Sequence, residues 1–287
     1  MKIKRLALYH FRRVTHIDMS FHEQLTVLVA KNGAGKTSIL DGLAIALGAV
    51  LTRLPGISGL NPKDTDLQVF PDGSKPAYLR IECETTAGIQ WDKTEKRDQT
   101  LKTAKQIPAA KGVKPIYDFV DSLVDHYNEG KEFELPVLIY YGTGRGVFEI
   151  PQRKRGFKKV FTRFDALRGS LESRNNFKSF VEYFYALEDI ENKAQKEARS
   201  FDVTIPELEA IRKAVTIMMP GFSNPRGSQP AGIAIDWAQQ DGSVKTLKIE
   251  QLSDGYRTTL AMIMDIASRM AEANPWMPDP LKTAGVV

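Results

Sequence analysis

The residues best suited to chemistry stand together in one short run, Ala30-Lys31-Asn32-Gly33-Ala34-Gly35-Lys36-Thr37. This run matches the phosphate-loop pattern G-x-x-x-x-G-K-[ST] at every fixed position but the first, where Ala30 replaces glycine. Backbone N–H groups can converge on a phosphate only if the loop residues are small and can adopt positive φ. Gly33 and Gly35 meet that requirement.

The side chains at the end of the run predict a bound nucleotide triphosphate with Mg²⁺. Lys36 is placed to reach the β and γ phosphates, and the Thr37 hydroxyl is placed to bind the metal. A following helix would add the partial positive charge of its N-terminus. The alternative is a chance glycine turn between a strand and a helix. The expected nucleotide contacts are Asn32, Gly33, Ala34, Gly35, Lys36, Thr37 and Ser38.

A second anion-binding pattern lies far along the chain, at Leu252-Ser253-Asp254-Gly255-Tyr256-Arg257. A Ser-x-Gly that opens a helix offers a hydroxyl and free backbone N–H groups. By itself the pattern is typical of an ordinary helix N-cap. Its occurrence together with a phosphate loop favours a second phosphate contact, in which Ser253 takes part with Lys36 in catalysis.

The elements around the phosphate loop are predicted from apolar spacing. Residues 2–11 form a strand, and the unbroken apolar run at 25–29 is typical of a buried central strand. A helix follows the loop and should stop at Gly48. Its apolar face consists of Ile39, Leu40, Leu43, Ala46 and Leu47.

The rest of the chain alternates between strands and helices, which indicates an α/β fold. Two strands flank the turn at Ala87-Gly88, a hairpin surrounds Asp241-Gly242, and a buried strand is expected within residues 135–141. The basic stretch 93–114 is predicted to be a mobile loop. Helices are predicted over residues 116–128, 177–199, 206–219 and 252–271.

Composition places the chain among folded proteins with an intracellular address. It has 287 residues, of which 42% are apolar, and a formal net charge of +5. The single cysteine, Cys83, excludes an internal disulfide, and four scattered histidines form no metal-ligand pattern. No apolar run is long enough for a membrane span or a signal peptide, so we expect a cytoplasmic protein without a membrane partner.

The motifs resemble those of a known superfamily. AKNGAGKTS and LSDGYR, with His10-Phe11-Arg12, are similar to the ATP-binding head shared by ABC-type, SMC-type and DNA-repair ATPases. The segments QLTVLVAKNGAGKTSILDGLAIALG, LPVLIYYGTGR and LSDGYRTTLAMIMDIASRMA resemble bacterial AAA-domain ATPases that include the ATPase subunit of Septu anti-phage systems, some of them attached to retrons. The resemblance implies two heads that dimerise around ATP and Mg²⁺, with Ser253 and Gly255 of one protomer closing over the partner's nucleotide.

Further site residues are implied by the same resemblance, each with an alternative. Arg12 matches the N-terminal arginine that approaches the phosphates, or it is a surface charge beside a buried Phe11. Arg257 reaches the partner's nucleotide or pairs with an acid. Gln68 is the candidate for the metal- and water-sensing glutamine, or it is solvated in a surface loop. Arg145 follows a buried strand and is either functional or part of a plain turn.

One part of the superfamily pattern is missing from the sequence. Hydrolysis requires a second acidic strand, the Walker B strand, with a catalytic glutamate. Residues 281–287 match only the opening of that strand. We therefore expect either a portion of a longer ATPase or a truncated form that binds nucleotide without hydrolysing it. The predicted fold is an ABC/SMC-type α/β head with a helical insertion, divided into residues 1–145, 146–225 and 226–287.

A basic block within the insertion has two interpretations. Interleaved cations and aromatic rings can bind the phosphates and bases of a nucleic acid. Alternatively, the block is a solvated loop whose phenylalanines turn into the core. Its members are Arg153, Lys154, Arg155, Phe157, Lys158, Lys159, Phe161, Arg163 and Phe164.

These observations and the resemblance together predict an ATP-controlled, dimerising subunit of an anti-phage complex. The expected partners are a second copy, in a dimer or a higher oligomer, and a nuclease, with a reverse transcriptase and nucleic acid as further candidates. One alternative is a DNA-repair ATPase that acts on DNA ends. The other is a scaffold that binds nucleotide without catalysis.

Overall fold

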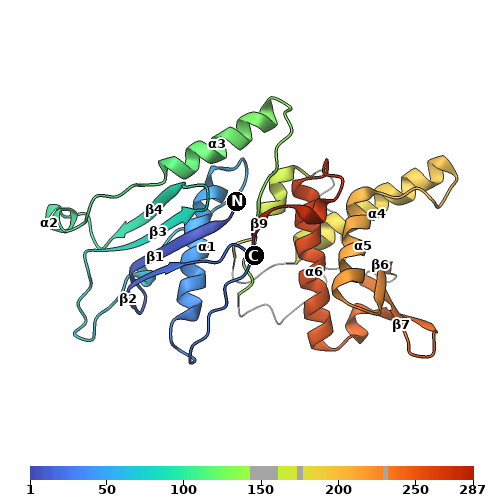
Figure 1. Ribbon diagram of the computed structural model, residues 1–287, viewed down its shortest axis with the longest axis horizontal. Coiled ribbons are helices and arrows are strands. Elements are labelled where there is room, and N and C mark those ends of the chain that lie inside the picture. The colour runs from blue at the N-terminus through green and yellow to red at the C-terminus, as the bar shows by residue number, and fades with distance from the viewer. Residues whose placement is uncertain (143–160, 173–176, 229–231) are drawn as a thin grey trace. The chain divides into compact units, whose positions relative to one another are not determined.

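The computed structural model describes residues 1–142, 161–172, 177–228 and 232–287 (Figure 1). The chain divides into two compact units. Unit 1 comprises Met1–Gly142, Leu171–Ser173 and Ala284–Val287, and unit 2 comprises Thr143–Ser170 and Arg174–Thr283. The three-part division expected from the sequence stays a prediction, although its boundary after residue 225 falls within one strand, β6 (Phe222–Ser228).

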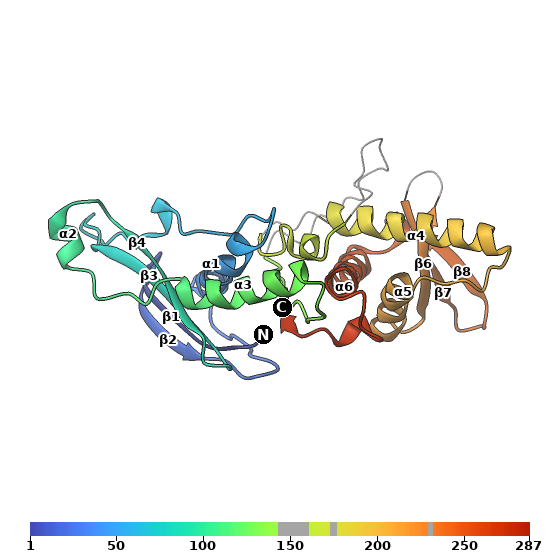
Figure 2. The ribbon, with the colours of Figure 1, turned by 90° about the horizontal axis from the view of Figure 1, so that it is seen from above.

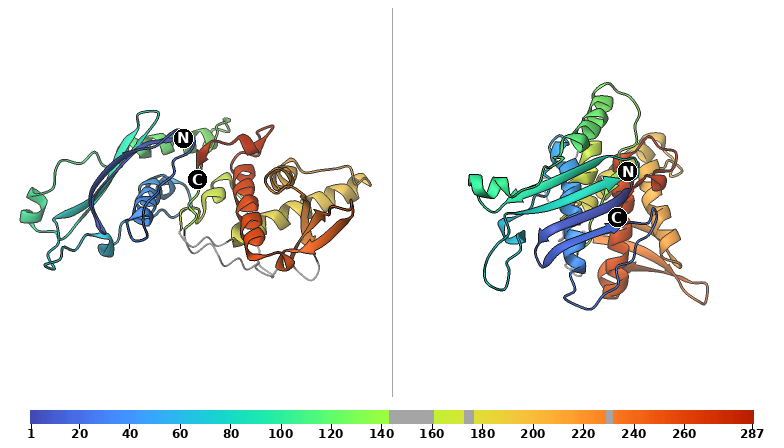
Figure 3. Two further views of the ribbon diagram at one scale, coloured as in Figure 1. Left: turned by 60° about the horizontal axis from the view of Figure 1, so that its bottom comes forward. Right: turned by 60° about the vertical axis from the view of Figure 1, so that its left-hand side comes forward.

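The sheet of unit 1 contains four antiparallel strands in the order β2-β1-β3-β4, which form one twisted layer (Figure 3). The expected first strand and the pair around Ala87-Gly88 are confirmed, whereas β2 was not predicted. Gly88 has φ of 83°, as a tight turn between strands requires. The strands are β1 (Ile3–Phe11), β2 (Val14–Ser20), β3 (Tyr78–Thr85) and β4 (Gln90–Lys96).

Helix α1 (Lys36–Arg53) packs on β1 and β3, and α3 (Lys114–Asn128) packs on β4 and on α1 (Figure 2). Both helices therefore cover the same face of the sheet. At Gly42 the helix approaches β1 so closely that a Cβ atom would lie 2.7 Å from Leu8 Cδ2. The fully buried Trp91 indole donates a hydrogen bond of 3.0 Å to the carbonyl of Ala46. These contacts fix the helix that follows the phosphate loop.

The predicted end of this helix at Gly48 is wrong, because α1 continues to Arg53. A Cβ atom at Gly48 would lie 2.5 Å from the carbonyl oxygen of Leu60. The glycine is therefore there to let the loop after the helix pack against it. From the sequence alone, a glycine that ends a helix cannot be told from a glycine that lets another segment pack closely against the helix.

The basic stretch 93–114 is also more ordered than expected, since it contains the short helix α2 (Leu101–Lys105), capped by the Thr100 hydroxyl. Its C-terminal part is anchored to the sheet. Arg80 donates to the carbonyls of Pro108 and Ala109, and the Asp92 carboxylate accepts the backbone N–H groups of residues 111 and 112. These anchors join residues distant in sequence, so local composition gives no sign of them.

The last residues of the given sequence, Ala284–Val287, belong to unit 1. Strand β9 (Gly285–Val286) pairs in parallel with β5 (Val137–Leu138). The buried strand predicted within residues 135–141 is therefore confirmed in part, with two residues in regular pairing. The extended end predicted for residues 281–287 is also present over β9.

In its described residues, unit 2 combines three α-helices with a three-stranded antiparallel sheet in the order β6-β7-β8. Helix α5 packs on α6 and β6, and α4 packs on α5 and α6. The helices and the hairpin around Asp241-Gly242 are confirmed, and β6 was not predicted. The elements are α4 (Lys178–Ala198), α5 (Pro206–Met218), β6 (Phe222–Ser228), β7 (Gly232–Ala238), β8 (Val244–Lys248) and α6 (Asp254–Ala273).

Short 3-10 turns at Asp64–Asp66, Arg163–Leu167, Ile249–Gln251 and Pro280–Lys282 join these elements. Across the described residues, none of the helices combines the length and the apolar character that crossing a bilayer requires.

Candidate functional site

The phosphate loop has the backbone conformation of an anion cradle. Gly35 is the N-cap of α1 and adopts φ of 94°, and Gly33 adopts φ of 80°. Among the described residues no side chain caps the α1 N-terminus, so its first N–H groups keep their donor capacity. No described atom lies within 4 Å of a Cβ built on Gly33, which leaves space beside the loop.

The Lys36 side chain folds back over this loop. Its Nζ donates hydrogen bonds of 2.6 Å to the Ala30 carbonyl and 2.9 Å to the Lys31 carbonyl. The ammonium is therefore held at the loop by neutral acceptors, which an anionic oxygen can replace with a stronger, charge-assisted bond. Thr37, Asn32 and Ala34 are exposed, and Ser38 is half-buried.

This arrangement fits the predicted ligand. Uncapped N–H groups, two glycines at positive φ and a cation over the loop are the features that a nucleotide phosphate chain requires. Lys36 and the backbone of residues 33–37 would hold the phosphates, and Thr37 would hold Mg²⁺. The bound metal would supply charge neutralisation at the phosphates.

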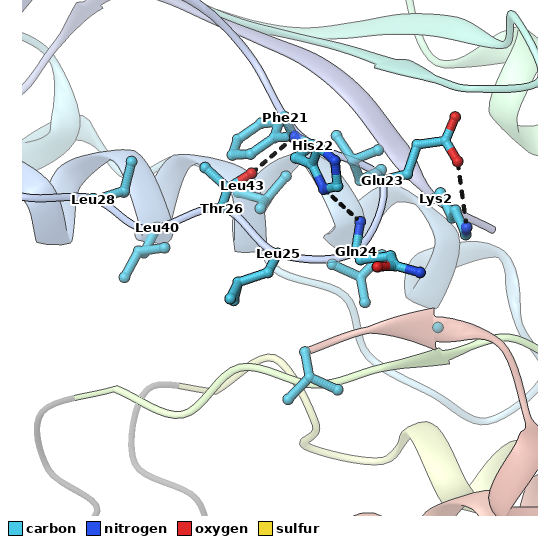
Figure 4. Close-up of a pocket in the computed structure, with 14 residues that line it drawn as sticks. Lys2, Phe21, His22, Glu23, Gln24, Leu25, Thr26, Leu28, Leu40 and Leu43 are labelled. Atoms are coloured by element: carbon cyan, nitrogen blue, oxygen red, sulfur yellow. Dashed lines mark hydrogen bonds and ion pairs between the residues drawn. The ribbon is translucent and has the colours of Figure 1, made fainter.

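The segment before the loop differs from its prediction. Residues 25–29 were expected to be a buried central strand, but they form no regular strand, and Leu25, Val27 and Val29 are 73%, 69% and 88% exposed. A local turn overlaps the start of this segment: the His22 backbone N–H donates to Thr26 Oγ1, and the Gln24 N–H donates to His22 Nδ1 (Figure 4). An apolar run indicates that a segment is suited to burial. It does not show that a neighbouring strand pairs with the segment.

A cavity of about 190 Å³ lies beside this segment and α1 (Figure 4). It is lined by residues 21–26, by leucines 28, 40 and 43, and by chain ends at residues 2–3 and 285–287. None of residues 30–37 lines it. This cavity is therefore separate from the phosphate loop.

Arg12 lies in a network of carboxylates beside the loop. Its Nε donates a hydrogen bond of 2.8 Å to Asp66 Oδ1, and its Nη1 donates to Asp41 Oδ2. The Tyr140 hydroxyl donates a hydrogen bond of 2.6 Å to the other oxygen of Asp41. Burial lowers the pKa of Arg12, but the hydrogen bonds to Asp41 and Asp66 outweigh that effect and raise it. The guanidinium also lies 5.0 Å from the Phe11 ring centroid.

The backbone at Arg12 carries strain. Arg12 adopts φ of 55° and His10 adopts φ of 53°, a region that L-residues rarely occupy. Strained residues persist where surrounding contacts hold them, and they concentrate at functional sites. Arg12 is therefore not a simple surface charge beside Phe11. Its contact with phosphate stays a prediction.

Gln68 is joined to the same turn. Its backbone N–H donates to the His10 carbonyl at 2.9 Å, and its side-chain Nε2 donates to Thr15 Oγ1 at 3.0 Å. The residue is 8% exposed, so the alternative of a solvated loop residue is wrong. Its role in sensing metal and water stays a prediction.

Sequence reasoning missed three members of this network, Asp41, Asp66 and Tyr140. Asp41 had a usable signal, because it stands four residues after Thr37 and so shares a helix face with it. Asp66 and Tyr140 come from distant loops, and no local pattern places them near Arg12.

In unit 2, Ser253 is the N-cap of α6, with φ of −61° and ψ of 155°. Its side chain makes no capping hydrogen bond to the described backbone, and the residue is exposed. The hydroxyl and the first N–H groups of α6 are therefore not used by an ordinary N-cap. No described atom lies within 4 Å of a Cβ built on Gly255, so the backbone is open to close approach.

Arg257 forms an ion pair with Asp254, three residues earlier on α6. Its pairing with an acid is thus present in the structure. The Asp254 side chain is 87% exposed, so this is a surface pair of small energy. Contact of Arg257 with a partner's nucleotide stays a prediction.

The basic block falls mostly outside the described residues, as does Arg145. Among its described members, Phe164 is buried, and Phe161 packs edge-on against Tyr183. Arg163 donates to the Ala273 carbonyl and to Asn274 at the end of α6. These three residues therefore pack against, or donate hydrogen bonds to, other residues of the protein. Binding of nucleic acid by the basic block stays a prediction.

Comparison with known proteins identifies relatives. A family model described as an AAA domain matches residues 5–218. The Retron Vc95 probable ATPase of Vibrio cholerae serotype O1 biovar El Tor is 18% identical, with 100% of this chain and 63% of that protein covered. The Retron Ec83 probable ATPase of Escherichia coli is 22% identical, with 94% and 59% covered. The chain thus spans about 60% of the length of these relatives.

The SMC head domain from Thermotoga maritima is 12% identical, with a TM-score of 0.42 over 100% of this chain and 88% of that structure. This TM-score is too low to establish the fold. The fold assignment rests instead on the family match and on the elements described above. Because the family model covers well over half of the sequence, the protein belongs to the AAA-domain family, with the α/β fold of a phosphate-loop ATPase.

Proposed function

We propose that this chain is an SMC-type ATP-binding head that dimerises when it binds ATP and Mg²⁺. In this proposal Lys36, Thr37 and the loop backbone hold the phosphates, and Ser253 and Gly255 of a second copy close over the γ-phosphate. The observation that carries it is the uncapped α1 N-terminus, with Gly35 at φ of 94° and Lys36 folded over the loop carbonyls.

We further propose that the head controls a nuclease in an anti-phage complex. The support is the similarity to two proteins named as retron ATPases, at 18% and 22% identity. Loss of nucleotide would free or activate the nuclease. A reverse transcriptase and nucleic acid are the additional partners that this proposal admits.

Binding is tested first, by titrating Mg²⁺-ATP into the wild-type protein and into Lys36→Ala. We expect micromolar binding by the wild type and a loss of at least a hundredfold in the variant. Lys102→Ala is the matched control, because this exposed lysine lies on α2 in the same unit. Equal affinity in Lys36→Ala and wild type would remove the phosphate loop from the proposal.

Dimerisation is tested separately by analytical ultracentrifugation with and without ATP. Ser253→Arg should leave nucleotide binding intact and keep the protein monomeric, because a bulky cation at the α6 N-terminus blocks closure. Thr259→Arg, at an exposed position further along α6, controls for the added charge. ATP-dependent dimers of Ser253→Arg would contradict closure through the signature.

The cellular role is tested by phage plating on bacteria that carry the protein with its neighbouring genes. Protection should be lost with Lys36→Ala and retained with Lys102→Ala. Protection that survives loss of nucleotide binding would contradict ATP control. Tight binding and dimerisation without turnover would favour the scaffold alternative over the ATPase.

A further inference from the structure

We propose that Asp41 and Tyr140 are positioning residues that hold the Arg12 guanidinium with its Nη2 group toward the terminal phosphate of the nucleotide. This inference rests on the proposed function, because it requires nucleotide at the phosphate loop. It gives a function to the hydrogen bonds that join Arg12, Asp41, Asp66 and Tyr140. Phosphate binding by the loop does not require these hydrogen bonds.

Two independent observations place the network beside the phosphate loop. Asp41 lies on α1 four residues after Thr37, so the two side chains are neighbours on one helix face, about 6 Å apart along the axis. The turn that carries Arg12 also touches the loop, because Val14 Cγ2 lies 3.8 Å from a Cβ built on Gly35. Arg12 is therefore fixed next to the cradle.

Two of the three guanidinium nitrogens are held by carboxylates. Nε binds Asp66 and Nη1 binds Asp41, whereas Nη2 has no acceptor among the described residues. The Arg12 side chain remains 35% exposed. A guanidinium has five N–H donors in a rigid fork. Donors on Nη2 are thus left for an anion while the carboxylates set the plane of the group.

Both carboxylates are themselves held in place. Asp66 is 5% exposed, and its second oxygen accepts the Lys63 backbone N–H at 2.9 Å. Asp41 accepts the Tyr140 hydroxyl at 2.6 Å. Burial, followed by the hydrogen bond to Asp41, raises the pKa of Tyr140, so its hydroxyl stays protonated and donates at neutral pH. Tyr140 therefore fixes the carboxylate that fixes Arg12.

A guanidinium held in advance loses little conformational entropy when it binds an anion. The proposed consequence is discrimination between nucleotides. ATP presents a γ-phosphate to Arg12 and ADP does not, so the clamp should increase the preference for ATP. Loosening Arg12 should reduce affinity for ATP more than affinity for ADP.

The test measures the dissociation constants of Mg²⁺-ATP and Mg²⁺-ADP by calorimetry for single variants of the full chain. Asp41→Asn, Tyr140→Phe and Arg12→Lys should each lower the preference for ATP at least threefold. Combining Arg12→Lys with Asp41→Asn should add little, since both act on one contact. The control is Asp121→Asn, which breaks the paired Arg53–Asp121 contact at the other end of α1 and should leave the preference unchanged.

Three outcomes would overturn the inference. An equal loss of ATP and ADP affinity would show a purely structural role for Asp41. A higher preference for ATP in Asp41→Asn would show that Asp41 competes with phosphate instead of positioning Arg12. Unchanged constants in Tyr140→Phe, which removes one oxygen and is the variant expected to fold if Asp41→Asn does not, would exclude the relay through tyrosine.

Failure of the proposed function has a different signature. If wild type binds neither nucleotide, or if Lys36→Ala binds both normally, the phosphate loop is not the site and the proposed function fails with this inference. If Lys36→Ala abolishes binding while the Asp41, Tyr140 and Arg12 variants keep the wild-type preference, only the inference fails.

Discussion

Two residues of unit 1 have an unusual conformation or environment. Gly35 occupies φ of 94°, where a side chain is strained, and Lys93 is buried without a carboxylate partner among the described residues. Lys93 Nζ donates instead to the Leu60 carbonyl and to Asn61 Oδ1 at 3.0 Å. Gly35 is explained by the phosphate loop. Lys93 is explained by anchoring the loop that packs against α1.

Gly35→Ala should destabilise the protein by about 1 to 2 kcal/mol, because a Cβ is disfavoured in the left-handed region. Nucleotide affinity should fall at least tenfold, since the loop relaxes away from the cradle conformation. Gly73→Ala is the matched control, at φ of 81° with no described atom within 4 Å of its Cβ. It should cost similar stability in denaturant titration and leave nucleotide affinity unchanged.

Lys93 should make stability depend on pH. Burial lowers its pKa to about 8, whereas an unfolded lysine has a pKa near 10.4. Between these values the unfolded chain binds more protons, so stability rises with pH across that window and is lowest below about pH 8. Relative to Lys93→Met, the wild-type unfolding free energy should rise by about 2 kcal/mol from pH 8 to 10.5. Parallel pH curves for the two proteins would contradict this assignment.

At the scale of elements, helix α1 connects the phosphate loop to the core. Its N-terminus is the cradle, Asp41 on its first turns holds Arg12, and its middle packs on β1 through Gly42. Its C-terminal half meets the loop around Leu60 at Gly48. Because glycine has no side chain, Gly42 lets β1 approach the helix and Gly48 lets the loop around Leu60 approach it. The position of the phosphate loop therefore depends on how α1 packs.

Gly48→Ala tests this packing against helix propensity. Propensity alone predicts a gain of about 1 kcal/mol. The new Cβ would lie 2.5 Å from the Leu60 carbonyl oxygen, so we expect a net loss of about 2 kcal/mol instead. Gly255→Ala on α6, with no described atom within 4 Å, should be neutral or stabilising by at most about 1 kcal/mol. Chemical denaturation of both variants measures the change in unfolding free energy, which should be negative for Gly48→Ala and zero or positive for Gly255→Ala.

At the scale of the whole molecule, the two halves of the expected nucleotide site belong to different compact units. The phosphate loop lies in unit 1, and Ser253 lies in unit 2. A nucleotide held only by the phosphate loop would directly contact unit 1. Direct contact with the α6 N-terminus in unit 2 is expected when the signature closes over the nucleotide.

Hydrogen exchange tests this division. With Mg²⁺-ATP at a hundredfold excess over the dissociation constant, amides of α1 should gain up to about 2.7 kcal/mol of protection. In Ser253→Arg the gain in α1 should remain while the α6 N-terminus gains nothing. In the wild type the α6 N-terminus should gain protection only at concentrations that give dimers. Equal protection of α6 in monomers would contradict closure by a second copy.

The sequence by itself determined the features that depend on local pattern. The helix after the phosphate loop, the helices of unit 2 and the hairpin at Asp241-Gly242 follow from apolar spacing and turn residues, which act over a few positions. The family also follows from such local runs. Domain boundaries and the roles of Arg145 and Arg257 stay predictions.

Only the tertiary structure decided what each pattern contacts. The apolar run at 25–29 is exposed, Gly48 lies inside α1, and the stretch 93–114 is anchored by Arg80 and Asp92. The clamp around Arg12 likewise joins residues 12, 41, 66 and 140. Hydrogen bonds and close contacts between distant segments depend on how the chain packs, and a local pattern of residue types contains no information about the partner.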